Sequence, residues 1–331
     1  MNPPRFLPAL LLLGTLAAAP AAVTSALGIA GNTNVFIIGN ADAPYGGQAQ
    51  GSVVVQGNFS GTNYDVRLVK GTSTPGSPIP ENADLYIGGN DTVDGGQGNE
   101  AAVRANSGDI YIGGAYTNEN LVAKNGNIYN KSFDLAPTVE NLVKLSSELA
   151  KMDSVAISLD PKEVSVKVDL DQNTVNGKGL KVYTVDGSML GSINNLSFSG
   201  GTGGETIVVN VLGHTVDWGL STNSADDGRI LWNFVDQASG EKGDDSAQTL
   251  NINTMFKGTI LAPAADVNQN ANINGTLIAN NWNIGKNATM MDGKFTGEIN
   301  LVSAPEPAGL LTMGGFLGLA LFSRRRSAGG L

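Results

Sequence analysis

Cysteine is absent from this sequence of 331 residues, and histidine occurs once, at His214. Without cysteine the chain can form no disulfide framework, so its stability must come from packing and backbone hydrogen bonds. Thiolate ligands are excluded for the same reason, and a single histidine cannot build a site that needs two imidazoles. We therefore predict no cofactor and no zinc-type metal centre.

Few residues are suited to catalysis. A serine triad would have to use His214, with Asp217 three residues later as the orienting carboxylate. No Gly-x-Ser-x-Gly turn is present to supply the nucleophile. The alternative is a structural strand histidine, which the pattern favours. We predict no catalytic residue.

Aromatic residues are also scarce, at 6% of the chain, with tryptophan only at Trp218, Trp232 and Trp282. These are few for a groove that stacks sugar rings. Polysaccharide lyases and glycosidases do occur on β-solenoids, so the fold alone excludes no enzyme. A glycosidase needs two carboxylates about 5 to 10 Å apart, and the 30 acidic residues neither exclude nor assign such a pair. A carbohydrate-active enzyme is therefore the alternative function.

Basic residues are outnumbered, with 20 Lys and Arg against 30 Asp and Glu and a formal net charge of −10. Phosphate binding needs clustered Lys and Arg, so this balance argues against nucleic acid as a partner.

Acidic loops raise the question of calcium. Asp169, Asp171 and Asn173 have the spacing of the first oxygen ligands of a calcium loop, but Thr174 and Leu180 occupy the positions where an EF-hand needs Gly and Glu. An irregular calcium site is the alternative, here and at the pairs 226–227 and 244–245.

Long hydrophobic runs are missing, and the two short ones lie at the ends of the chain. Arg5 precedes an apolar run at 6–18, which small residues follow. This pattern is typical of a signal peptide, predicted at residues 1–26. The run is shorter than the ~20 residues that span a bilayer. The sequence therefore predicts export.

The C-terminal segment 304–331 differs from everything before it. Residues 308–322 are uncharged and would form a helix roughly 22 Å long, short of the ~30 Å hydrocarbon core. The arginines that follow would stay on the cytoplasmic side by the positive-inside rule. Pro305-Glu306-Pro307, the apolar run, and Arg324, Arg325 and Arg326 together resemble the PEP-CTERM sorting signal of exopolysaccharide-producing Gram-negative bacteria. The resemblance implies an exosortase as partner, a transient inner-membrane anchor, and delivery to the cell surface or extracellular matrix.

Short β-type runs that end in Gly-Asn or Gly-Gly recur through the body of the chain, at 35–38, 53–55, 85–87 and 110–112. Bulkier runs follow at 181–185, 206–213 and 229–234, and GTILA at 258–262 recurs 17 residues later as GTLIA. Runs bounded by such turn formers predict strands, and their repetition favours a β-solenoid over an antiparallel sandwich. Asparagine is dense between 251 and 300, and stacked Asn at equivalent corners can form hydrogen-bonded ladders.

One segment breaks the β pattern. Apolar residues recur at intervals of three and four, which predicts one amphipathic helix at about 135–152 docked on a sheet, with Asp134 as its cap. The apolar positions are Leu135, Val139, Leu142, Leu145, Leu149 and Met152.

The order of these blocks from SALGIAGNTNVFIIGN to FKGTILAPAADVNQNANINGTLIAN resembles the choice-of-anchor A domain, over residues 27–303. That family is regarded as adhesive, and its outline is similar to ice-binding-like domains. The resemblance implies a mostly β solenoid with one docked helix, and a non-enzymatic adhesive or scaffolding role with polysaccharide or other surface proteins as partners. Ice binding is a second alternative, which would need a flat Thr array; Thr259 and Thr276 are equivalent, but the pattern does not continue.

Overall fold

The computed structural model describes residues 26–66, 78–92, 103–116, 121–160, 162, 164–174, 176, 179–223, 227–236, 248–286 and 288–299. The predicted signal peptide, except Ala26, and the predicted sorting tail lie outside these residues. Within the described ranges, no helix is long and apolar enough to cross a membrane.

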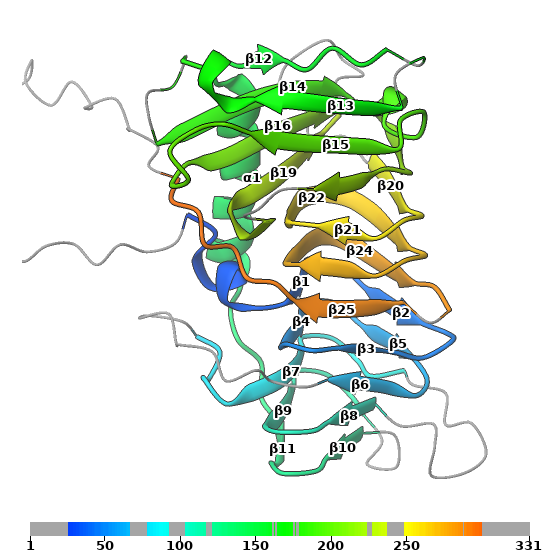
Figure 1. Cartoon of the computed structure of the whole chain (residues 1–331). Helices are drawn as coiled ribbons and strands as arrows, with labels where there is room; N and C mark the ends of the chain where they lie inside the picture. Colours follow the sequence, from blue (N-terminus) through cyan, green and yellow to red (C-terminus); the bar gives the residue numbers. More distant parts are fainter. Residues whose placement is uncertain are drawn as a thin grey trace, which may run out of the picture.

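The chain winds into a stack of coils with three strand-bearing faces, and the strand pairs of the described residues are all parallel (Figure 1). This confirms the predicted β-solenoid. The first face, called the covered face, consists in spatial order of β11 (Ile128–Asn130), β9 (Asp109–Ile112), β7 (Ala83–Ile87), β4 (Val53–Val55), β1 (Val35–Ile37), β24 (Leu277–Ile284), β22 (Thr259–Gln269), β19 (Ile230–Val235), β16 (Thr206–Leu212), β14 (Leu180–Asp186) and β12 (Val155–Ala156).

The second face, called the ladder face, begins where the long strands β22 and β24 turn the corner. It consists of β17 (Thr215–Trp218), β20 (Gln248–Ile252), the second halves of β22 and β24, β2 (Ala41–Ala43) and β5 (Phe59–Gly61).

The third face contains the remaining strands, in two sheets that meet where β18 lies beside β21. They are β13 (Ser165–Asp169), β15 (Asn195–Ser199), β18 (Ser221–Asn223), β21 (Phe256–Lys257), β23 (Ile273–Gly275), β25 (Thr289–Asp292), β3 (Gly47–Ala49), β6 (Tyr64–Val66), β8 (Val103–Ala105) and β10 (Leu121–Ala123). Four short 3-10 turns complete the coils: η1 (Gly28–Asn32), η2 (Leu170–Gln172), η3 (Gly187–Met189) and η4 (Asp227–Arg229).

The order of coils in space departs from their order in the sequence. β1 lies between β4 and β24, so the first and last coils meet in the middle of the stack. The chain winds from β1 to one end at β11, crosses to the other end, and winds back from β12 to β24. The sequence pattern contained no sign of this crossover, because each coil shows the same local alternation.

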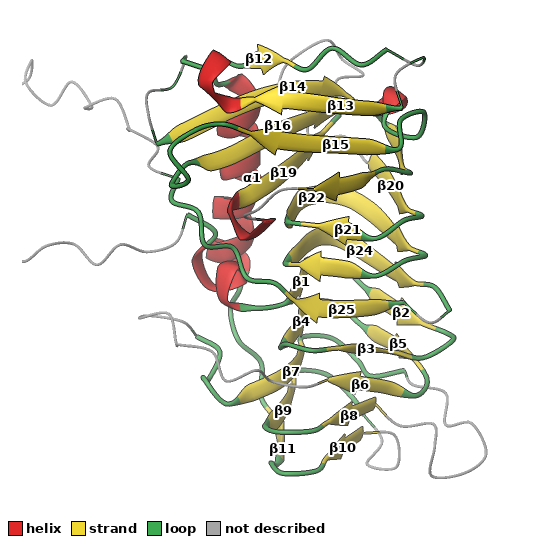
Figure 2. Cartoon of the chain, viewed as in Figure 1, coloured by secondary structure: helices red, strands yellow, loops and turns green. Residues whose placement is uncertain are grey.

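Helix α1 (Ala136–Lys151) belongs to the crossover from β11 to β12 and runs along the covered face (Figure 2). Its 16 residues span about 24 Å, roughly five strand spacings. The predicted stripe is confirmed, since Leu142, Leu145 and Leu149 are buried against outward side chains of the sheet. The N-cap residue is Leu135 and not Asp134 as predicted, although Oδ1 of Asp134 accepts a hydrogen bond from the Ala136 N–H at 3.0 Å.

A buried polar network fixes how the helix docks. The hydroxyl of Ser146 donates to Oδ1 of Asn233 at 2.7 Å, and Nδ2 of Asn233 donates to the Ser146 carbonyl at 2.9 Å. Nδ2 of Asn210 donates to the Leu149 carbonyl at 2.9 Å. Because an unpaired polar group in this interface would cost free energy, the network favours one register of helix on sheet.

Candidate functional site

The ladder face presents a regular array of polar side chains. Along each strand, outward polar residues alternate with buried apolar ones, as the two-residue period of a strand requires. The outward residues are Thr215 and Asp217 of β17, Thr249 and Asn251 of β20, Asp266 and Asn268 of β22, Asn281 and Asn283 of β24, Asp42 of β2 and Ser60 of β5. Three of these ten side chains are carboxylates, and none is basic.

One column of this array is an amide ladder along the solenoid axis. Nδ2 of Asn251 donates to Oδ1 of Asp217 at 2.8 Å, Nδ2 of Asn268 donates to Oδ1 of Asn251 at 2.8 Å, and Nδ2 of Asn283 donates to Oδ1 of Asn268 at 2.9 Å. The four residues are direct register partners on successive parallel strands. Strands about 4.8 Å apart bring equivalent amides within hydrogen-bond reach.

The corner between the covered face and the ladder face has a second ladder. Oδ1 of Asn281 accepts from the Asn40 N–H, Oδ1 of Asn40 from the Asn58 N–H, and Oδ1 of Asn58 from the Asn90 N–H, each at 2.8 Å. Oδ1 of Asn90 accepts in turn from the Ala115 N–H at 2.9 Å. The predicted stacking of asparagines at equivalent corners is confirmed.

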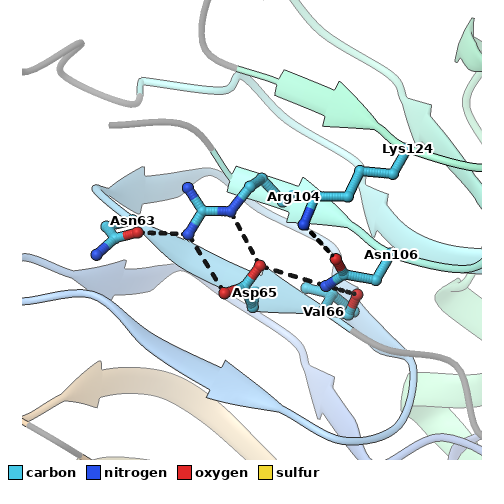
Figure 3. Close-up of polar contacts among 6 residues, drawn as sticks. All are labelled: Asn63, Asp65, Val66, Arg104, Asn106 and Lys124. Atoms are coloured by element: carbon cyan, nitrogen blue, oxygen red, sulfur yellow. Dashed lines mark hydrogen bonds and ion pairs between the residues drawn. The ribbon is translucent and has the colours of Figure 1, made fainter. Parts of the chain in front are cut away.

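A third polar cluster lies on the third face, across β6, β8 and β10 (Figure 3). Nε and Nη2 of Arg104 contact the two carboxylate oxygens of Asp65 at 2.9 and 3.3 Å, and Nη2 also donates to Asn63. Asn106 donates to Asp65 at 3.3 Å and accepts from Nζ of Lys124 at 2.7 Å.

Electrostatics stabilise the charged form of Asp65. Partial burial by itself would raise its pKa, but the hydrogen bonds from Arg104 and Asn106 and the charges of Arg104 and Lys124 lower the pKa below its ordinary value. Arg104 therefore pairs with Asp65, Lys124 is held by Asn106, and we assign the cluster to cohesion between coils.

The structure shows which carboxylate contacts His214. Its Nδ1 lies 2.5 Å from Oδ2 of Asp236, which is fully buried, whereas Asp217 belongs to the amide ladder. The His214 side chain is exposed, in the turn before β17. The carboxylate paired with His214 is that of Asp236 and not that of Asp217, and this pair fits the structural histidine that the sequence favours.

The carboxylates of the candidate calcium loop accept hydrogen bonds from backbone N–H groups. Oδ1 of Asp169 accepts from the Asp171 N–H, and Oδ1 of Asp171 accepts from the Gly201 N–H. Asn173 is buried and donates to the Val182 carbonyl. Over the described ranges, no three His, Asp or Glu side chains gather as a metal-binding group. Asp227 forms an ion pair with Lys257 at 3.3 Å, and Asp226, Asp244 and Asp245 lie outside the described residues.

Other candidates are interior. The GTILA repeat is confirmed, since Ile260 and Leu277 are register partners in adjacent coils. Thr259 and Thr276, however, are fully buried, so they cannot form a surface array. Trp218, Trp232 and Trp282 are also fully buried and pack with Phe and Tyr rings inside the solenoid, so none can stack on a sugar.

The sorting-signal residues Pro305, Glu306, Pro307, Arg324, Arg325 and Arg326 lie outside the described residues. The outward residues of the ladder face are the candidates that sequence reasoning missed. Their signal was present in runs such as LNIN and NWN, where asparagine alternates with apolar residues.

Comparison with known proteins identifies the family. Residues 26–290 match the family described as "Putative Ice-binding-like adhesive domain". No curated protein matches the chain.

Several solved structures are similar to the chain. An ice-binding protein from an Antarctic Biological Consortium is 14% identical, with 86% of this chain and 96% of that one covered and a TM-score of 0.36. A glycosylated ice-binding protein from an Arctic yeast is 15% identical, with 86% and 97% covered and a TM-score of 0.36. A domain of ice-binding protein 1 from Shewanella frigidimarina is 12% identical, with 84% and 98% covered and a TM-score of 0.34.

Proposed function

Because the chain belongs to the family of ice-binding-like adhesive domains, we propose that it is an exported, non-enzymatic surface or extracellular-matrix protein that adheres through its ladder face. The observation that supports this most directly is the array itself. Asn251, Asn268 and Asn283 present the same amide group on successive coils at strand spacing, which suits a ligand that is itself extended and repetitive. Extracellular polysaccharide is the partner we propose, with scaffolding within the matrix as the role.

The described residues nearest the two ends of the chain support an outward-facing ladder face. The chain enters β1 through η1 and leaves β25 at the corner between the third and covered faces (Figure 1). Residues 293–299 then follow that side, where the Thr296 N–H donates to the Gly228 carbonyl, the Glu298 N–H donates to the Thr206 hydroxyl, and Ile299 is buried with the helix core. This corner is opposite the ladder face, so an anchor attached there would leave the ladder face turned outward.

We propose further that the two ends of the chain direct export and anchoring. A choice-of-anchor A domain at 27–303 would be exported by the signal peptide and held briefly in the inner membrane by residues 308–322. An exosortase would then cut near Pro305-Glu306-Pro307 and deliver the protein to the surface or matrix.

The first test is the C-terminal peptide mass of the protein from membrane and matrix fractions of the native host. A matrix form that ends near residue 305 supports processing. An intact tail in protein confined to the inner membrane would contradict it. Binding of the purified matrix form to host exopolysaccharide, without release of reducing ends or unsaturated products, separates adhesion from a carbohydrate-active enzyme.

Ice binding is the second candidate, favoured by the family description and by the regular register of the array. Of the ten outward side chains of the ladder face, only Thr215 and Thr249 are threonines. Measurement of thermal hysteresis and of ice-crystal shape in the presence of the protein tests this candidate. Unshaped crystals and no hysteresis would exclude it.

A further inference from the structure

The amide ladder has one junction at which no side chain supplies a donor. Below Asn283, the next register partner in the column is Asp42 of β2, and beyond it Ser60 of β5. The hydroxyl of Ser60 donates to Oδ1 of Asp42 at 2.7 Å. Asn283 and Asp42 are joined by no hydrogen bond, although both belong to the described residues.

The missing hydrogen bond between Asn283 and Asp42 follows from the number of donors in the column. An asparagine in a ladder presents its NH2 to one neighbour and its oxygen to the other, whereas an ionised aspartate only accepts. Between Asp217 and Asp42 stand three amides and four junctions. Three donors cannot fill four junctions, whichever way the amides are turned. Because Asn251, Asn268 and Asn283 all donate toward Asp217, the empty junction is the one beside Asp42.

This junction is an acceptor pair open to solvent. Asn283 is exposed and Asp42 is half-buried. The junction lies where the first and last coils of the chain meet. Oδ1 of Asn283 and the second oxygen of Asp42 can therefore accept from a donor outside the protein. A ligand hydroxyl can supply this donor, and hydrogen bonds to a charged acceptor are among the stronger ones.

A metal ion fits less well. Calcium takes six to eight oxygen ligands, and the junction offers one carboxylate and one amide. The face as a whole adds Asp217 and Asp266 at other coils and presents no basic side chain among its ten outward residues. That charge disfavours an anionic polymer and leaves a neutral, hydroxyl-rich one as the complementary ligand.

We propose that the Asn283–Asp42 junction is the primary attachment point of a neutral polysaccharide, whose hydroxyl groups donate to these two residues and whose chain lies along the ladder. This inference rests on the proposed adhesive function and specifies its ligand class and contact residues.

The decisive variant is Asp42→Asn, which is almost isosteric. An amide at position 42 can donate to Oδ1 of Asn283 and still accept from Ser60, so it closes the ladder. We expect its melting temperature to rise by about 2 °C. Asp217→Asn removes the same charge from the same column, but its junction already has a donor, so no rise is expected there.

Binding is measured by retardation in gels that contain host exopolysaccharide, separated into neutral and uronic-acid fractions. Protein is purified from the native host in its mature form. We expect the wild type to be retarded by the neutral fraction, and Asp42→Asn to bind about tenfold more weakly. Asp153→Asn, an exposed aspartate beyond the end of α1, should bind as the wild type does.

Unchanged binding by Asp42→Asn would overturn the inference and leave adhesion intact. Retardation by the uronic-acid fraction alone would also overturn the inference and leave adhesion intact. Binding that EDTA abolishes and calcium restores would have the same consequence. A wild type that binds neither fraction would remove both the inference and the proposed polysaccharide partner.

Discussion

Oδ1 of Asn58 accepts a hydrogen bond from the backbone N–H of Asn90 at 2.8 Å, although 32 residues separate them in the chain. The contact joins equivalent corners of adjacent coils. The segment of chain between the two corners includes β5, β6 and β7. Corner asparagines therefore act as a side-chain extension of the parallel ladder.

Replacing this acceptor tests the corner ladder. Asn58→Ala leaves the Asn90 N–H to solvent and should lower the free energy of unfolding by about 1 kcal/mol. Asn58→Asp keeps an oxygen in place and should stay within about 0.5 kcal/mol of the wild type. Urea denaturation at neutral pH measures both. Equal losses in the two variants would show that the acceptor is not what matters.

The corner asparagines Asn40, Asn58 and Asn90 each follow a glycine that leaves room for the adjacent coil. A Cβ on Gly89 would lie 2.4 Å from Oδ1 of Asn58 and 2.8 Å from the Gly57 backbone. Gly89→Ala should destabilise the protein by about 1–3 kcal/mol, because backbone cannot move aside as a flexible side chain can.

Gly179→Ala is the matched control, since nothing lies within 4 Å of its added Cβ. It should be neutral or stabilising by up to about 1 kcal/mol. If both alanines behave alike in thermal unfolding, coil spacing does not depend on Gly89.

The helix is expected to depend on a polar contact as well as on its apolar stripe. Ser146→Ala removes the hydroxyl that donates to Oδ1 of Asn233 and leaves that buried oxygen unpaired, at a cost of about 1–3 kcal/mol. Ser147→Ala, one residue along and half-buried, should cost less than about 0.5 kcal/mol. Chemical denaturation of the two variants compares them. A Ser146→Ala protein as stable as Ser147→Ala would contradict the docking role.

Glu205 should make stability depend on pH in the acid range. Burial would raise its pKa, but hydrogen bonds from the Thr202 and Gly204 backbone and the Thr202 hydroxyl dominate and lower the pKa from 4.5 to about 2. A lowered folded-state pKa means that the stabilisation is present above about pH 4.5 and is lost as pH falls toward about 2.

Glu205→Gln cannot titrate, so it provides the comparison. The stability difference between wild type and variant should be largest above about pH 4.5 and narrow toward about pH 2. Urea midpoints measured across this range give the difference at each pH. A stability difference that does not change with pH would exclude Glu205 as the source of the pH dependence.

The sequence alone determined the elements of this protein. Short apolar runs predicted β1, β4, β7 and β9, and the interval of three and four predicted α1, because side-chain period and turn formation depend on neighbours a few residues away. Gly-Asn pairs likewise indicated corners and their stacked asparagines.

Tertiary structure alone decided which elements meet. β1 pairs with β24 across a gap of some 240 residues, His214 pairs with Asp236 rather than Asp217, and Thr259 faces inward. A strand's local alternation shows that two sides differ but does not name the strand beside it or the side that is buried. The junction of Asn283 with Asp42 exists only because the last coil returns to the first, and that return is set by packing between distant segments.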